Sequence, residues 1–308
     1  MPFELNFAPW AAARRLGAII RALRSTASTA LLLGVALALG GCSAVRLSYN
    51  NAPELMFWWL DGFADFDKAQ SQRVRKDLAT LARWHRQQEL PLVAELLQSA
   101  EALANQPQPS SGQICALYAS SVLRMEALVE RALPTAAAVA PTLQASQIKS
   151  MATTYDKNNR KWREEWLTTD KDSLSRRTQK IRERLEDFYG PLTPAQLRQL
   201  QSNLDSIGTD QPLHYREILR RQQEVLQTLT QLRQSDAGTA QTALTVLAKG
   251  YLHSPDANYR AYKDQAVAQT CEAMADLHRT TTAQQRKNMV TALQGYAGDV
   301  RALMAQTP

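Results

Sequence analysis

Apolar residues recur every three or four positions along most of the chain, which is the period of a helix with one buried face. No stretch alternates apolar and polar residues over the length of a strand, so no β-sheet is expected. Ala, Leu, Gln, Arg and Glu dominate the composition, and all five are good helix formers. The pattern therefore predicts an all-α fold, an irregular bundle of about nine helices within residues 53–308.

The first helix of this bundle is expected to begin at Pro53 and to carry a stripe of large apolar residues. Leu55, Trp58, Trp59 and Phe63 fall at helical spacing. A stripe of this kind favours the buried face of a helix. A second interpretation stays open, in which Trp58 and Trp59 lie at a membrane interface, where tryptophan is enriched.

The first 41 residues have the pattern of a secretory signal. Arginines between Arg14 and Arg24 precede an apolar run of 13 residues, Ala27 to Leu39, which is shorter than the roughly 20 residues that span a bilayer. The run ends in Leu39-Gly40-Gly41-Cys42, which resembles the lipobox of bacterial lipoproteins. An ordinary signal peptide with a chance cysteine and a permanent membrane helix are the alternatives.

The lipobox resemblance implies a cleaved leader at 1–41, a lipid-modified Cys42, a tether at 42–52 and a helical periplasmic domain at 53–308. By its likeness to lipoprotein sorting signals, Ser43 implies the outer membrane, with the body on the periplasmic face. The diacylglyceryl group and a further acyl chain such as palmitate would make Cys42 a firm anchor, because two or more chains hold a protein stably.

The charge balance argues against nucleic acid as a partner. The whole chain has a formal net charge of +7, and removing residues 1–41 takes away four arginines and one glutamate. The remainder has 32 basic and 28 acidic residues, a net charge of +4. This is a mildly basic surface rather than a nucleic-acid footprint.

Two cysteines remain in the predicted domain, Cys115 and Cys271. The periplasm permits disulfides, so we expect these residues to form a bridge between two helices. Two separate buried thiols are the alternative. Reactive-thiol chemistry is not expected, since neither cysteine has a CxxC motif or a histidine beside it.

Three helix starts share one capping signal. In each, an Asp or Thr caps the helix and a Gln three residues later can reach back to the cap's own N–H. The segments are Phe66-Asp67-Lys68-Ala69-Gln70, Leu192-Thr193-Pro194-Ala195-Gln196 and Thr281-Thr282-Ala283-Gln284-Gln285. The second resembles the Leu-Thr-x-x-Gln motif of small periplasmic chaperones of the Spy type. Any capped amphipathic helix would show a similar pattern.

A broader resemblance covers nearly the whole mature chain. The segments that carry it look like an uncharacterised family of Gram-negative lipoproteins, a domain of unknown function. It implies a helical periplasmic lipoprotein and transfers no activity or site residues. The segments are Tyr49-Asn50-Asn51-Ala52, Trp58-Trp59-Leu60-Asp61, Trp84-His85, Asn158 to Trp166, Phe188-Tyr189-Gly190, Leu277-His278 and Gln285-Arg286.

No cofactor or metal is expected. His85, His214, His253 and His278 stand apart from one another in the sequence, and no HExxH occurs. Ser146 and Lys149 fit an SxxK motif whose companion motifs are missing, which indicates chance. Glu164 and Glu165 lie beside two tryptophans, but adjacent helical residues point about 100° apart.

Three functions remain for this chain. The favoured one is a non-enzymatic binding or scaffold protein of the cell envelope, with envelope proteins or anionic envelope polymers as partners. A holdase-like stress chaperone and a helical cell-wall enzyme acting through Glu164 or Glu165 are the alternatives. Arginine clusters at 73–76, 176–180 and 220–221 are either solvated helix faces or contacts for lipid headgroups and cell-wall polymer.

Overall fold

The computed structural model describes residues 44–167, 170–207 and 209–306. The chain divides into two compact units, Met1–Asn50 and Asn51–Pro308. In the first unit the described residues form one helix, α3 (Ala44–Asn50), within the predicted tether. The predicted leader and Cys42 lie outside the described residues. Within the described part of the chain, no helix is both long and apolar enough to cross a membrane.

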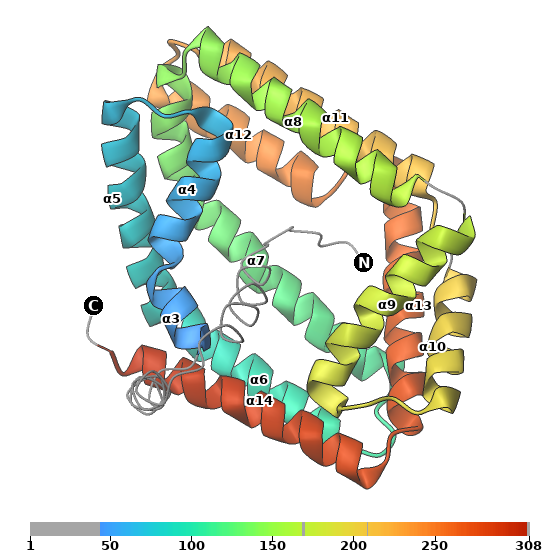
Figure 1. Cartoon of the computed structure of the whole chain (residues 1–308). Coiled ribbons are helices and arrows are strands. Elements are labelled where there is room, and N and C mark those ends of the chain that lie inside the picture. The colour runs from blue at the N-terminus through green and yellow to red at the C-terminus, as the bar shows by residue number, and fades with distance from the viewer. Residues whose placement is uncertain (1–43, 168–169, 208, 307–308) are drawn as a thin grey trace, which may run out of the picture. The chain divides into compact units, whose positions relative to one another are not determined.

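The second unit is built only of helices, and its described residues contain no strand (Figure 1). The all-α prediction is confirmed, but the number of about nine is wrong, because the described residues of this unit form eleven α-helices. The helices are α4 (Ala52–Ala64), α5 (Lys68–Trp84), α6 (Leu90–Asn105), α7 (Ser111–Val139), α8 (Ala145–Trp166), α9 (Asp170–Tyr189), α10 (Pro194–Ile207), α11 (Gln211–Leu232), α12 (Ala237–Leu252), α13 (Ala257–Arg279) and α14 (Ala283–Met304).

Two junctions differ from a simple chain of α-helices. A π-helix at His85–Glu89 joins α5 to α6. Pro91 lies two residues after the end of this turn, and since proline has no N–H to donate, one wider turn lets the helix continue past it. The α7 helix runs through Pro134 into the alanine run of 136–140, and a 3-10 turn at Ala140–Thr142 then leads toward α8.

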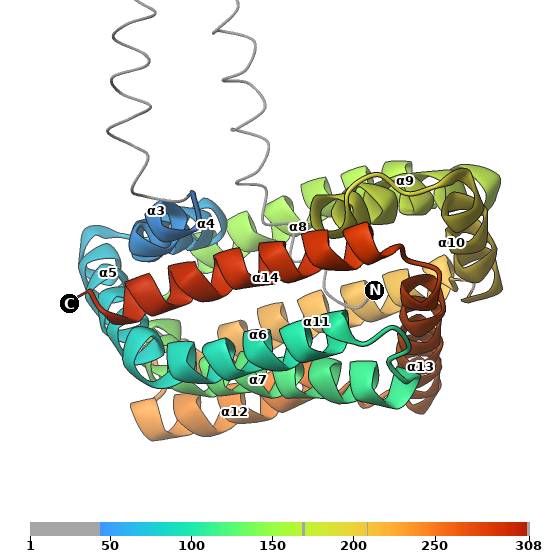
Figure 2. The same cartoon turned by 90° about the horizontal axis from the view of Figure 1, so that it is seen from below.

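The packing of the second unit is more regular than predicted. The contacts among helices α4 to α8 repeat among helices α9 to α14. In this correspondence α4, α5, α6 and α8 match α9, α10, α11 and α14, and the long helix α7 matches α12 and α13 together. Thus α4 packs on α5 and α8, and α9 packs on α10 and α14. The two halves exchange partners: α6 lies along α14, and α8 lies along α11 (Figures 1 and 2). The fold is therefore an internal repeat of two interlocked halves.

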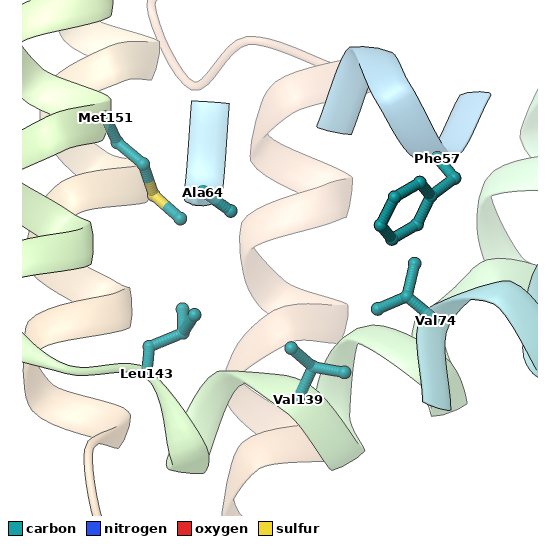
Figure 3. Close-up of a cluster of buried hydrophobic side chains, with 6 residues drawn as sticks. All are labelled: Phe57, Ala64, Val74, Val139, Leu143 and Met151. Carbon is teal, nitrogen blue, oxygen red and sulfur yellow. The ribbon is translucent and has the colours of Figure 1, made fainter. Parts of the chain in front are cut away.

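Each half has its own apolar cluster. In the first, Phe57 and Ala64 of α4 meet residues of α5, α7 and α8 (Figure 3). In the second, Leu185 and Tyr189 of α9 meet residues of α10 and α13. A third cluster, around Ala240, lies between α7, α11 and α12. Burial of these side chains stabilises the unit at about 25 cal/mol per Å² of apolar surface.

The predicted core stripe on α4 is wrong for three of its four residues. The core face of α4 is formed by Phe57, Leu60 and Ala64. Leu55 is 44%, Trp58 63% and Trp59 45% exposed. Both faces of this helix are apolar, so the sequence pattern alone does not say which face meets the core.

Candidate functional site

Four buried glutamines join the starts of four helices in two pairs, which we call the glutamine clasps. In the first clasp, Gln70 of α5 completes a capping box with Asp67, whose N–H donates to Gln70 Oε1 at 3.0 Å. Gln147 of α8 accepts in the same way from the Gln144 N–H at 2.8 Å. The two amides then bond each other: Gln147 Nε2 donates to Gln70 Oε1 at 2.7 Å, and Gln70 Nε2 donates back at 3.3 Å.

The second clasp repeats this geometry in the other half of the fold. Gln196 of α10 and Gln285 of α14 complete boxes with Thr193 and Thr282. Their amides bond each other in both directions, at 2.9 and 3.0 Å. All four clasp glutamines are buried, at 3–6% exposure.

The side-chain Nε2 of each clasp glutamine also donates to a backbone carbonyl in the segment just before its partner's helix. The Nε2 groups of Gln70 and Gln147 donate to the carbonyls of Thr142 and Asp65. Those of Gln196 and Gln285 donate to Thr280 and Pro191, each at 3.0 Å. In every case the accepting residue stands two positions before the partner's cap. Each clasp glutamine therefore caps its own helix and also holds the segment that leads into its partner's helix.

The sequence pattern identified three of these four starts and missed the one at Leu143-Gln144-Ala145-Ser146-Gln147. A glutamine at the cap position is outside the usual cap residues, which concealed it. The signal was the spacing from Leu143 to Gln147, which matches that from Leu192 to Gln196. A further capping box at Ser110 and Gln113 is exposed and has no clasp.

The clasps are joints rather than reaction centres. Every amide N–H and oxygen that they bury has a partner, so no donor is left to hold a ligand. Each joint brings together two helix N-termini, whose partial positive charges oppose close approach. The bonded amides offset that cost and fix how the two helices meet.

A second polar cluster surrounds Glu217 of α11, which is 3% exposed. Its carboxylate accepts hydrogen bonds from Arg220 at 2.6 and 2.8 Å and from Arg221 at 2.7 Å. Burial alone would raise the pKa of Glu217, but the bonds from these arginines outweigh it and hold the pKa below its usual value. The guanidinium of Arg221 also lies over the Tyr259 ring. The cluster is a neutralised ion network in the interior.

Aromatic residues extend this cluster from α11 to α8 and α13. Trp162 stacks on Tyr215 with ring centroids 5.1 Å apart. His214 Nδ1 lies 3.1 Å from the Tyr259 hydroxyl. Burial lowers the pKa of His214 to about 4, and the nearby Arg221 acts in the same direction. His214 is therefore neutral at the pH of most compartments.

A buried chain of polar groups links α9, α13 and the end of α6. His278 Nε2 lies 2.8 Å from the Gln106 carbonyl, and His278 Nδ1 lies 2.8 Å from the Tyr189 hydroxyl. Since a carbonyl only accepts, Nε2 carries the proton and Nδ1 accepts from the tyrosine. Burial lowers the pKa of His278, which favours this neutral form.

A shallow groove of about 310 Å³ lies between α8 and α11. Tyr155, Leu219 and Leu226 supply its apolar part. Asn159 and Gln222, which also line it, bond each other at 2.8 and 3.0 Å. These amides are satisfied by each other, so the groove has few polar atoms aimed at a ligand.

The remaining candidate residues are dispersed. Cys115 of α7 and Cys271 of α13 form a disulfide with Cα atoms 5.5 Å apart. Glu165 pairs with Lys180, whereas Glu164 is exposed, and Ser146 and Lys149 are exposed on the surface of α8. No group of three or more metal-ligating side chains occurs within residues 44–167, 170–207 and 209–306. Cys42, the predicted lipidation site, is not among the described residues.

A family model matches residues 62–260, and its description is a family of unknown function, DUF6279. The match covers more than half of the chain, from the end of α4 to the first turn of α13. No match was found among curated proteins or among solved structures.

Proposed function

Because the chain belongs to DUF6279, a family of unknown function, we propose a role from its own residues: a lipoprotein anchored through Cys42 to the periplasmic face of the outer membrane. In this role the helical unit is a non-enzymatic binding or scaffold protein of the envelope. The observation that carries the proposal is the sequence Leu39-Gly40-Gly41-Cys42 after a short apolar run. The disulfide between α7 and α13 supports it, since such bridges persist in oxidising compartments.

The scaffold role is supported by the way the helices are held. The two clasps, the Glu217 network and the His278 chain use nearly all their polar groups to join helices to one another. A rigid frame of this kind presents fixed helix faces to a partner. The exposed side chains in the second half of α8 have an excess of positive charge that suits anionic envelope polymers; the cations Lys157, Arg160, Lys161 and Arg163 outnumber the acids Asp156 and Glu164.

The anchor is tested by fractionation of cells that produce the wild type and Cys42→Ser. We expect the wild type in the outer membrane and the variant in the inner membrane or the soluble fraction, with its leader uncleaved. A Val246→Ala variant, changed at an exposed site of α12, is the matched control. Equal outer-membrane recovery of wild type and Cys42→Ser would overturn the anchor.

The scaffold role is tested by photo-crosslinking in the periplasm. A photoreactive residue replaces Arg160 on the basic face of α8, and a second version places it at Lys249 on α12. A discrete crosslinked envelope species from the first position and not from the second supports a specific partner. Identical diffuse labelling from both positions contradicts it.

A holdase-like chaperone is the second candidate. The clasps support it, because helix starts resembling Leu-Thr-x-x-Gln meet in pairs in both halves of the fold. Three large apolar side chains that could contact unfolded clients are exposed on α7, α11 and α12; they are Leu123, Leu219 and Tyr251. Suppression of the aggregation of an unfolded client at near-stoichiometric amounts would support this role, and its absence would dismiss it.

A further inference from the structure

The outward face of α4 is apolar from end to end. Between Glu54 and Asp65, the exposed positions are Leu55, Trp58, Trp59 and Gly62. They follow the spacing i, i+3, i+4, i+7, so they lie along one side of the helix. The opposite side packs Phe57 and Ala64 into the first apolar cluster. A helix that is apolar on both sides needs a second apolar environment beyond its own core.

The composition of this face matches a lipid interface. Trp is enriched where hydrocarbon meets headgroups, because its ring is apolar and its indole N–H is polar. The charged residues Glu54 and Asp65 stand at the two ends of the face, and its exposed middle carries no charge. With 13 residues, α4 is too short to span a bilayer, and a helix of this kind lies in the plane of the interface.

The covalent chain limits how far this face can be from the anchor. Fifteen residues lie between Cys42 and Trp58; seven of them form α3 and six belong to α4. At about 1.5 Å per helical residue and at most about 3.6 Å per extended one, Trp58 lies no more than about 30 Å from the lipidated sulfur. Any placement of the first unit keeps α4 within reach of the membrane surface.

We propose that α4 is a second membrane contact, in which Leu55, Trp58 and Trp59 insert into the lipid headgroup region beside the acyl anchor. The inference rests on the proposed function, because the anchor supplies the nearby membrane. Acyl chains and an apolar helix face together hold a protein more firmly than either does alone. The contact would also fix which side of the helical unit faces the bilayer.

The test uses the full mature chain in phosphatidylethanolamine–phosphatidylglycerol vesicles that contain lipids brominated near the headgroup, which quench tryptophan on contact. The wild type is compared with Trp58→Ala/Trp59→Ala and with Val246→Ala. Two of the five tryptophans of the mature chain lie on this face, so we expect bromination to remove about two-fifths of wild-type and control emission. The double variant should lose little, and circular dichroism should show that it keeps its helices.

Equal fractional quenching of the wild type and the double variant would overturn the inference. The inference would also be overturned if the protection of Trp58 and Trp59 followed the density of protein on the vesicles and not their bromine content. A second copy of the chain would then be the occupant of this face. Flotation and intact mass of the same samples report the anchor separately. If the acylated chain floats with the vesicles but the wild type and the double variant are quenched equally, the anchor stands and the α4 contact is refuted. If the chain carries no acyl groups but the two proteins differ in quenching, the α4 contact stands and the anchor is refuted.

Discussion

Replacing Gln196 by Leu should reveal how much one glutamine clasp contributes to stability. The amide of Gln196 makes four hydrogen bonds, to the Thr193 N–H, the Thr280 carbonyl and both amide atoms of Gln285. A buried hydrogen bond contributes about 1 kcal/mol net, so the loss is about 4 kcal/mol. Leucine regains about 1 kcal/mol through its apolar surface. The free energy of unfolding should therefore fall by about 3 kcal/mol.

The matched control is Gln113→Leu, in the capping box of α7. Gln113 is exposed, and within its box its amide accepts only the Ser110 N–H. An exposed cap of this kind contributes about 1 kcal/mol or less. Guanidinium unfolding of a chain beginning at Ser43, with the disulfide intact and with helix content followed by circular dichroism, gives both values.

A double-mutant cycle with Gln285→Leu separates the clasp from the two caps. Two hydrogen bonds join the amides of Gln196 and Gln285. Gln285→Leu should therefore lower the free energy of unfolding by about 1–3 kcal/mol less in the Gln196→Leu protein than in the wild type. Gln70→Leu shares no partner with Gln196, so those two effects should add. Equal costs for Gln196→Leu and Gln113→Leu, or additive costs for Gln196→Leu and Gln285→Leu, would refute the reasoning.

Three further predictions concern the remaining polar groups. Glu217→Gln removes the buried carboxylate that two half-buried arginines share and should cost about 3 kcal/mol. Glu224→Gln, whose side chain is 38% exposed, should cost less than about 1 kcal/mol in the same unfolding assay. The pair Cys115→Ser/Cys271→Ser should lower the free energy of unfolding by about 2–5 kcal/mol, and added reductant should then have no further effect. His214 has a pKa of about 4 in the folded state and about 6.5 in the unfolded state. As the pH falls below 6.5 the unfolded state takes up a proton that the folded state does not, so the free energy of unfolding falls until about pH 4. His214→Gln should flatten this part of the stability–pH curve, and an unchanged slope would contradict the burial argument.

The helical class and most helix starts could be predicted because their signals are local. Asp67 with Gln70 and Thr282 with Gln285 lie three residues apart, and such a pair reports a helix start on its own. The clasps could not be predicted, since Gln70 meets Gln147 and Gln196 meets Gln285 across 77 and 89 residues. Only the paired packing of the two halves brings these residues together.

The α4 helix shows a different limit of sequence reasoning. Its period indicates a helix, but Phe57 and Trp58 both belong to apolar stripes. Which stripe meets the core depends on Val74, Val139 and Met151, which come from three other helices. Tertiary packing therefore decides which stripe of α4 is buried, and the other stripe is the candidate membrane contact.

The intact mass of the protein isolated from the outer membrane of a Gram-negative host tests the proposed anchor most directly. We predict a chain that begins at Cys42 and carries a diacylglyceryl group and a further acyl chain on that residue. A chain that retains residues 1–41, or one that begins at residue 42 with an unmodified thiol, would contradict the account.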